Sequence, residues 1–239
     1  MVYQAVFKRY ELKYMLTLEQ KLRLLEEMAP YMALDRYGQT TIRNLYFDTD
    51  NYRLIRRSME KPVYKEKLRL RSYRQAEPES DVFVELKKKY DSVVYKRRLS
   101  MPEKQAMDWA AGRTPIPSPC QIGAELDYFR QFYQTLRPTV FLSYQREAFC
   151  CRGGGDFRVT FDDTILARQE ALSLEAPVWG TPLLPEGKVL LELKTSGGIP
   201  LWMTGFLTRE GIHRTAFSKY GTAYEKMIFP NHKGGFLYA

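Results

Sequence analysis

Residues 65–71 alternate cations with mostly apolar side chains, and this pattern constrains the fold of the chain more than any other feature. In a β-strand successive side chains point to opposite faces, so Leu68 and Leu70 would pack in a core while the cations share the other face. Like charges side by side on one face repel, and a solvated face usually mixes both signs. The single-signed row therefore indicates a sheet whose charged face binds a polyanion. The row comprises Lys65, Lys67, Arg69 and Arg71.

The charge of the whole chain agrees with this interpretation. Its 37 Lys and Arg against 28 Asp and Glu give a net charge of +9, which favours phosphates, nucleic acid or an acidic membrane surface as partners. The three cysteines are an odd number, so a disulfide framework is not expected. No signal segment opens the chain, and no apolar run approaches the roughly 20 residues that span a bilayer. We therefore expect a cytoplasmic protein without a membrane segment of its own.

Short alternating segments separated by turn residues dominate the chain, and 44% hydrophobic residues are enough for a sizeable core. Because neighbouring strands often lack an intervening helix and no long linker divides the chain, we predict an α+β fold with one large antiparallel sheet, in a single domain over residues 1–239. The helix at 17–29 should begin with a capping box formed by Thr17 and Gln20. Strands are expected at residues 5–14, 40–49, 62–73, 81–89, 92–99, 138–150, 156–163 and 187–195. Helices are expected at residues 17–29, 102–111, 121–135, 200–210 and 217–228.

The one-sided charge pattern recurs in several other strand segments. Glu85 and Lys87 share one face of their segment, and Glu192 and Lys194 do the same. On an open sheet such charges would form a wet surface, whereas in a closed sheet they would line an interior. A buried ion without a partner costs several kcal/mol, so a charged interior needs water, carboxylates or a polyanion. The other residues placed in this way are Arg9, Glu11, Lys13, Lys96, Arg98, Tyr144, Arg146, Arg158 and Asp162.

An ordered series of short motifs makes the chain similar to a known family. The motifs are Tyr10-Glu11-Leu12-Lys13-Tyr14, Tyr46-Phe47-Asp48-Thr49, Leu68-Arg69-Leu70-Arg71, Val84-Glu85-Leu86-Lys87, Tyr95-Lys96-Arg97-Arg98, Tyr144-Gln145-Arg146, Leu191-Glu192-Leu193-Lys194 and Phe217-Ser218-Lys219-Tyr220. Together they resemble the VTC domain of polyphosphate polymerases, which belongs to the triphosphate tunnel metalloenzymes alongside the CYTH proteins. The resemblance covers residues 5–228. Each motif alone is weak, and the ordered set is specific.

The resemblance implies a closed antiparallel β-barrel with flanking helices, whose tunnel binds triphosphate. In the eukaryotic relatives, ATP gives its γ-phosphate to a growing polyphosphate chain, and a glutamate holds a divalent metal, here expected to be Mn²⁺ or Mg²⁺. Here the implied metal ligand is Glu192, with Glu11 and Glu85 as further candidates. The implied catalytic residues are Arg69, Arg71, Lys87, Arg146, Arg158 and Lys219. The implied phosphate-binding residues are Lys13, Lys67, Lys96, Arg98, Tyr144, Lys194 and Ser218.

One position departs from the family pattern. Many tunnel enzymes begin with Glu-x-Glu-x-Lys, whereas this chain has Arg9-x-Glu11-x-Lys13. The change removes a metal ligand, which favours binding of a long phosphate chain over two-metal hydrolysis of triphosphate. Only His213 and His232 are present, and neither lies in a strand motif. We therefore expect direct attack of an acceptor phosphate on the ATP γ-phosphate, without a phospho-enzyme.

Three functions require the same basic face. The first is an ATP-dependent polyphosphate polymerase, the second a non-catalytic module that binds polyphosphate or another phosphorylated ligand, and the third an inorganic triphosphatase. Nucleic acid is not expected as a partner, because most aromatic residues alternate away from the cations, as core residues do. The sequence is compatible with a membrane-protein partner and leaves the oligomeric state open.

Overall fold

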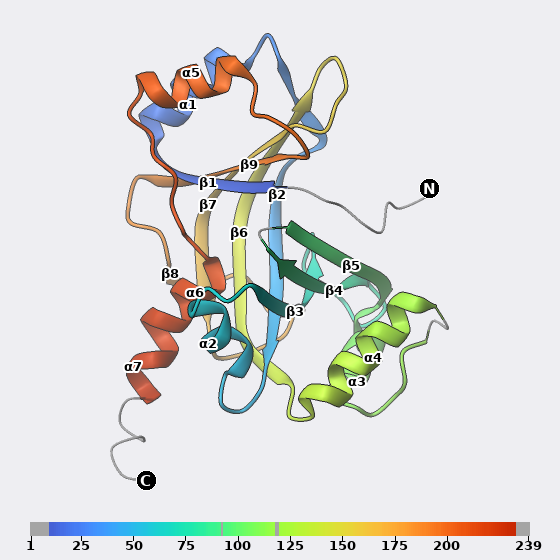
Figure 1. Ribbon diagram of the computed structural model, residues 1–239. Helices are drawn as coiled ribbons and strands as arrows, with labels where there is room; N and C mark the ends of the chain where they lie inside the picture. The colour runs from blue at the N-terminus through green and yellow to red at the C-terminus, as the bar shows by residue number, and fades with distance from the viewer. Residues whose placement is uncertain (1–9, 92, 118–119, 233–239) are drawn as a thin grey trace.

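A single antiparallel sheet forms the centre of the protein (Figure 1). The computed structural model describes residues 10–91, 93–117 and 120–232. The strands follow the order β1-β9-β7-β6-β2-β3-β4-β5 across the sheet, and β8 pairs with β7. Their bounds are β1 Tyr10–Thr17, β2 Met32–Asp48, β3 Tyr64–Ser72, β4 Asp81–Tyr90, β5 Val93–Pro102, β6 Arg137–Cys151, β7 Arg158–Arg168, β8 Thr181–Pro182 and β9 Lys188–Thr195.

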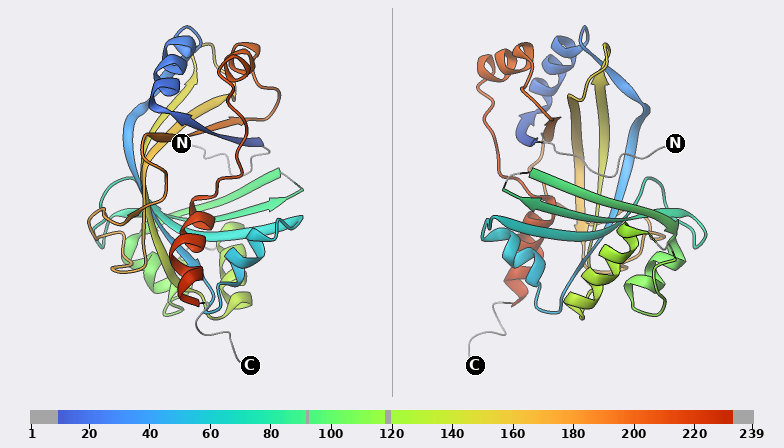
Figure 2. Two further views of the ribbon diagram at one scale, coloured as in Figure 1. Left: turned by 90° about the vertical axis from the view of Figure 1, so that its left-hand side faces the viewer. Right: turned by 45° about the vertical axis from the view of Figure 1, so that its right-hand side comes forward.

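Two pairs of helices cover the outer face of the curved sheet (Figures 1 and 2). Helices α1 and α5 pack on β1, β7 and β9 around Leu24, Leu191 and Phe206, and α3 and α4 pack on β3, β4 and β5 around Leu68 and Trp109. These two apolar cores fix which strand residues face outward. The helices are α1 Leu18–Met28, α3 Glu103–Ala110, α4 Gln121–Tyr133 and α5 Leu201–Arg209.

A third apolar cluster lies on the inner face of the sheet. It joins Tyr46 and Tyr144, from β2 and β6, to Tyr220 and Tyr224 in the C-terminal helical segment. Helices α2 and α6 therefore pack against one end of the face that elsewhere carries the charges. The helical elements at this end are α2 Arg53–Met59, α6 Lys219–Ala223, the π-helical turn η1 Tyr224–Ile228 and α7 Phe229–His232.

Most predicted elements are present, with informative differences. The capping box of Thr17 and Gln20 is confirmed, with hydrogen bonds of 3.1 and 3.0 Å. Strand β2 begins at Met32 rather than at residue 40, because its first part pairs with the end of β6. Helix α2 was not predicted. The carboxylate of Asp48 accepts hydrogen bonds from the backbone N–H groups of Leu54 and Ile55, and this cap starts a helix that the sequence pattern does not show.

The antiparallel sheet with flanking helices agrees with the predicted fold class, but a closed barrel is not confirmed. Strands β1 and β5 are the two ends of the hydrogen-bonded order, and no ladder joins them within the described residues. An ion pair between Lys87 on β4 and Glu11 on β1, with Nζ and Oε2 2.6 Å apart, instead links the edge strand β1 to the strand next to β5. The N-terminal part of the predicted first strand, with Arg9, lies outside the described residues.

Candidate functional site

The inner face of the sheet collects the charged residues that the strand patterns single out. Leu68 and Leu70 are buried in the outer core with exposed fractions of 1% and 0%, which confirms the faces predicted for β3. The intervening side chains, Arg69 and Arg71, consequently point to the inner face. The inner-face residues of the other strands are Glu11, Lys13, Glu85, Lys87, Lys96, Arg98, Tyr144, Arg146, Asp162, Glu192 and Lys194.

One carboxylate, Glu85, organises the first cluster of cations. Its side chain is completely buried, and its oxygens lie 2.7 Å from Arg69, 2.6 Å from Arg98 and 2.6 Å from Lys96. The Nε atom of Arg71 is 3.7 Å away. Burial would raise the pKa of Glu85, but these cations outweigh burial and hold its pKa well below the ordinary value. Glu85 is therefore an ionised, saturated counter-ion rather than a free metal ligand.

The strand register explains this first cluster. Glu85 on β4 lies directly opposite Arg69 on β3 and Arg98 on β5, so their side chains meet on one face. Neighbouring strands then orient the arginines, because Arg71 donates to Asn44 Oδ1 at 2.9 Å and to the Tyr144 hydroxyl at 3.2 Å. The result is a rigid set of guanidinium groups, a geometry that suits bidentate contacts with phosphate oxygens.

Asp162 and Glu192 form the centre of a second cluster. Lys219, at the start of α6, places its Nζ atom 2.5 Å from Asp162 and 2.9 Å from Glu192. Arg146 donates to both oxygens of Asp162 at 2.6 Å and approaches Glu192 at 3.4 Å. Although burial opposes the charged form, the two carboxylates raise the pKa of Lys219. The cluster therefore fixes α6 to the inner face of the sheet through charge.

Two further lysines complete the surroundings of Glu192. Lys194 lies 3.2 Å from Glu192 and Lys13 lies 3.7 Å from it. Lys13 also donates to the Phe217 carbonyl at 2.9 Å, which ties β1 to the segment before α6. Burial would raise the pKa of Glu192, but Lys219 and these lysines keep it well below its ordinary value.

Lys67 has cations for neighbours and no carboxylate partner among the described residues. Its ammonium donates to the Ser218 hydroxyl at 3.2 Å. Burial, together with repulsion from Lys13, Lys87 and Lys65, lowers the pKa of Lys67 to about 7. An anion bound at this position would supply the missing counter-charge and restore the charged form. Lys67 thus marks a point of the inner face where the protein is short of negative charge.

The remaining predicted residues lie at the borders of the face. Lys87 faces Lys67 and Lys96 across the ladders and pairs with Glu11. Burial opposes ionisation of Glu11, but Lys87 in particular lowers its pKa to about 2. Arg158 lies opposite Lys194 in the register but is exposed, and in the described part of the chain it forms neither an ion pair nor a hydrogen bond.

Several residues of the site were not assigned a role from the sequence. Asp162 was placed on the charged face by its alternation with Arg158, but only the structure shows that it shares Lys219 with Glu192. Asn44 and Tyr46 were missed as well. The Tyr46 hydroxyl accepts a hydrogen bond from Arg69 at 2.9 Å. The motif Tyr46-Phe47-Asp48-Thr49 was the one available signal, and it contains no cation that would indicate a phosphate site.

A divalent metal would find few free ligands on this face. The described residues contain no group of three or more His, Cys, Asp or Glu side chains placed to hold a metal ion. Mg²⁺ is, however, often bound by one or two carboxylates together with phosphate oxygens and water. Asp162 and Glu192 converge on one cation, Lys219. A metal at these carboxylates would have to displace Lys219 and complete its ligands with phosphate oxygens and water, and the donor set does not fit a cage of protein ligands alone.

The curved antiparallel sheet thus presents a cation-rich inner face to a ligand, and comparison with known proteins identifies the family. The sequence profile described as the VTC domain matches residues 8–228. The chain therefore belongs to the VTC domain family. No curated protein matches the chain.

Solved structures show the same fold at low sequence identity. A proposed adenylate cyclase from Bacillus halodurans aligns with a TM-score of 0.58 at 14% identity, covering 94% of this chain and 100% of its own. HpAC1 from Hippeastrum, named as a proposed adenylyl cyclase with a dominant triphosphatase activity, aligns with the same score and identity over 94% of this chain and 98% of its own. The similarity extends over nearly the full length of these proteins.

Proposed function

We propose that this protein is an ATP-dependent polyphosphate polymerase that transfers the ATP γ-phosphate to a growing polyphosphate chain on its inner face. The observation that carries the proposal is the pairing of the inner-face carboxylates. Glu85, Asp162 and Glu192 are each saturated by cations, Glu11 pairs with Lys87, and all have lowered pKa values. The face still carries an excess of cations, and Lys67 in particular has no counter-ion among the described residues.

Because the inner-face carboxylates are paired with cations, we expect the phosphoryl group to be transferred to an acceptor phosphate rather than to water. Hydrolysis is helped by a general base that takes a proton from water, and a carboxylate with a lowered pKa that is engaged by arginine or lysine is a poor base. A terminal phosphate of an acceptor chain is already anionic and needs no base. Phosphoryl transfer then depends on positioning and on spreading charge, which arginines such as Arg69, Arg71 and Arg146 can provide.

Residues from both clusters have parts in this scheme. Arg69 and Arg71, about 7 Å apart along β3, would hold neighbouring phosphates. Lys219 and Ser218 would contact the phosphates from α6, and Glu192, once Lys219 turns from it to the phosphates, would hold a divalent metal brought by the triphosphate. When bound, such a metal neutralises charge on the reacting oxygens. We propose further that β1 approaches the β4–β5 edge of the sheet around the ligand to close the tunnel, with the Lys87–Glu11 pair between β1 and β4 as the first contact.

The direct test is to incubate the purified chain with ATP and Mn²⁺ or Mg²⁺ and to size the products. We expect long polyphosphate, lost in Glu192→Gln and in Arg69→Ala. The matched control is Arg97→Ala, because Arg97 lies next to Arg98 on β5 but points to the outer face and pairs with Glu125 at 3.1 Å. Release of orthophosphate alone would identify a triphosphatase, and binding of triphosphate without turnover would identify a binding module. Either result would overturn the polymerase assignment.

The proposed activity requires access to ATP. None of the helices in the described residues combines the length and the apolar character needed to cross a bilayer. We propose that the protein acts in the cytoplasm, where ATP is available as its substrate.

We also propose that the γ-phosphate is transferred directly, without a phospho-enzyme. A stoichiometric covalent phosphate on acid-quenched protein after incubation with γ-labelled ATP would contradict direct transfer.

A further inference from the structure

The cationic row of β3, from Lys65 to Arg71, has different neighbouring side chains at its two ends. At one end Tyr73 and Phe83 pack edge to face, with ring centroids 5.8 Å apart. The guanidinium of Arg98 lies 4.2 Å from the Phe83 ring centroid and donates to the Tyr73 hydroxyl at 2.9 Å. The same guanidinium contacts Glu85 at 2.6 Å. An aromatic pair is thus joined directly to the first cation cluster.

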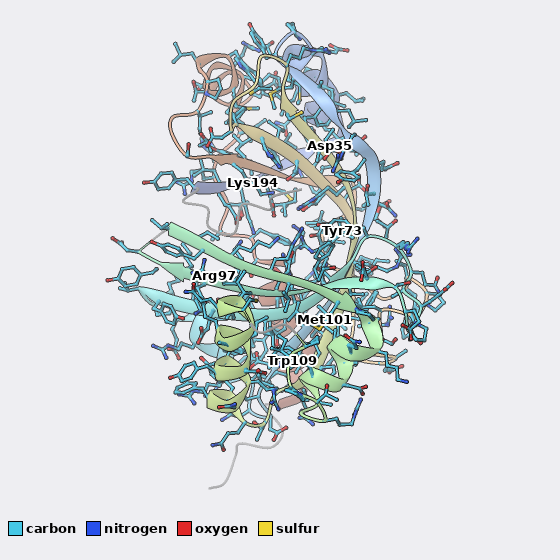
Figure 3. All side chains as sticks on the ribbon, turned by 90° about the vertical axis from the view of Figure 1, so that its right-hand side faces the viewer. Asp35, Tyr73, Arg97, Met101, Trp109 and Lys194 are labelled. Atoms are coloured by element: carbon cyan, nitrogen blue, oxygen red, sulfur yellow. The ribbon has the colours of Figure 1, made fainter. Side chains whose placement is uncertain are left out.

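The strand geometry places this aromatic pair on the inner face. Phe83 lies opposite Arg71 in the ladder and two residues before Glu85, and Tyr73 follows Arg71 by two residues. Figure 3 shows Tyr73 on the side of β4 and β5 that faces the part of the molecule carrying Lys194, whereas Arg97 lies on the opposite side, toward α4. Tyr73 is 41% exposed, so part of its surface is open to a ligand.

The other end of the row carries lysines instead of aromatic rings. Lys65 lies opposite Lys89, and Lys67 lies opposite Lys87, so like charges face each other across the ladder. Burial and Lys89 in particular lower the pKa of Lys65, whose ammonium donates to the Ser58 carbonyl at 3.2 Å. Like charges directly opposite each other are unfavourable until an anion lies between them. This end suits phosphate and offers nothing to a base.

We propose that Tyr73 and Phe83 form a subsite for the base of a nucleoside triphosphate, whose phosphates run over Arg71 and Arg69 toward Lys67. The inference rests on the proposed function, because it requires that the inner face binds triphosphate. Aromatic side chains stack on any base, since every base has a π-face. Arg98 links the two parts of the ligand site, because it contacts the Phe83 ring, the Tyr73 hydroxyl and the carboxylate at the centre of the first cluster.

The proposed base subsite fixes which end of the cationic row holds the γ-phosphate. With the base held by Tyr73, the γ-phosphate lies farthest from it along the strand, at the lysine end of the row. An acceptor phosphate would then approach from the side of Lys65 and Lys87. The same subsite would discriminate nucleoside triphosphate, which has a base, from inorganic tripolyphosphate, which has none. That difference makes tripolyphosphate the matched control ligand.

The test compares the binding of ATP and of tripolyphosphate by the full chain, measured by titration calorimetry in one Mg²⁺-containing buffer. We expect Tyr73→Leu to weaken ATP binding by about tenfold and to leave tripolyphosphate binding unchanged, since stacking on one ring is lost. Tyr73→Phe keeps the ring and should keep ATP affinity. The control Tyr90→Leu changes another exposed tyrosine, at the far end of β4, and should alter neither ligand.

Each outcome decides the inference. If Tyr73→Leu weakens both ligands alike, or Tyr73→Phe weakens ATP as much as Tyr73→Leu does, then Tyr73 only supports Arg98 and the base subsite is wrong. If neither variant changes ATP binding while the wild type binds both ligands, the inference fails and the proposed function stands. If the wild type binds neither ligand, the inference and the proposed function fail together.

Discussion

The two cation clusters of the inner face are built in different ways. The cluster around Glu85 comes from three consecutive strands, β3, β4 and β5, and its ion pairs follow from direct opposition in the ladders. The cluster around Asp162 and Glu192 combines β1, β6, β7 and β9 with Lys219 from α6, at the far end of the sequence. The first is a property of a local antiparallel unit. The second exists only when the C-terminal segment has packed against the sheet.

The packing of α6 depends on one buried tyrosine. The Tyr220 hydroxyl donates to Asp48 at 2.9 Å and lies 3.1 Å from the Thr139 hydroxyl. Its ring stacks on Tyr46 with centroids 4.8 Å apart. Because Lys219 precedes Tyr220, the Asp48 carboxylate positions a lysine that it does not contact. The same carboxylate caps α2, so both inner helices depend on one residue of β2.

The largest expected effect is the loss of the central carboxylate of the first cluster. Glu85→Gln leaves the surrounding arginines and Lys96, which are buried or half-buried, without their shared counter-ion. Breaking a buried ion pair in this way costs about 3–5 kcal/mol. Glu192→Gln should cost less, because Asp162 still pairs with Lys219 and Arg146. Urea denaturation of both variants measures the difference. A Glu85→Gln variant as stable as Glu192→Gln would show that the two clusters do not differ in this respect.

The second largest effect on stability is expected when the hydrogen bond between Tyr220 and Asp48, which holds α6 in place, is removed. Tyr220→Phe removes a buried hydrogen bond to a carboxylate and should lower the free energy of unfolding by about 1.5–3 kcal/mol. It should also weaken tripolyphosphate binding, because Lys219 and Ser218 lose their fixed position. The control is Tyr224→Phe, a buried tyrosine one turn later whose hydroxyl shows no hydrogen bond within the described residues. If Tyr220→Phe and the wild type bind tripolyphosphate with equal affinity, then the second cluster does not contribute to tripolyphosphate binding.

A smaller effect concerns the pH dependence of binding at Lys67. The folded, ligand-free pKa of about 7 is below the ordinary value of 10.5, so the unfolded state binds more protons between these values. Stability without ligand therefore gains from this group as the pH rises from 7 to 10.5. Anion binding requires the charged ammonium, so tripolyphosphate affinity should fall about tenfold from pH 6 to pH 8.

The matched variant for this experiment is Lys67→Arg, which stays charged throughout the range. Tripolyphosphate itself takes up protons in this range, so the informative quantity is the ratio of the two affinities. We expect the ratio of wild-type to Lys67→Arg affinity to fall as the pH rises. A constant ratio would show that Lys67 is fully protonated in the free protein.

The smallest effect is expected at the edge pair between β1 and β4. Lys87 and Glu11 remain partly exposed, with side-chain fractions of 33% and 23%, and such pairs contribute at most about 1 kcal/mol. Glu11→Gln should therefore lower stability slightly and only at low salt. Tripolyphosphate affinity should rise, because Lys87 is released. A loss of several kcal/mol would mean that this pair holds the two edges of the sheet together.

The sequence predicts the first cluster better than the second for a physical reason. The alternation around Leu68 and Leu70 fixes the face of β3, and the short connections from β3 to β5 allow few registers, so Arg69, Glu85 and Arg98 could be expected to meet. No local pattern links Lys219 to Asp162 and Glu192, since their contact depends on how α6 packs. The hydrogen-bonding roles of Asn44 and Tyr46 also escape a search based on charge.

Register and exposure set further limits on prediction from sequence. Arg158 shares the inner face as its alternation predicts, yet it lies exposed at the start of β7, and its role as a phosphate ligand stays a prediction. The part of β2 before residue 40 pairs with β6 at Met32–Leu34 and again from Gln39, and Gly38 lies in the register shift between these two stretches. Pairing partners distant in sequence supply information that the segment itself lacks.

The uncompensated charge around Lys67 has a consequence for the lifetime of the protein in a cell. A ligand that binds only the folded chain raises its free energy of unfolding by RT ln(1 + [L]/Kd). We therefore expect the folded fraction to follow the supply of phosphate-rich anions and to decrease when they are depleted. Proteolysis of the transiently unfolded chain should then be slower with tripolyphosphate than without it.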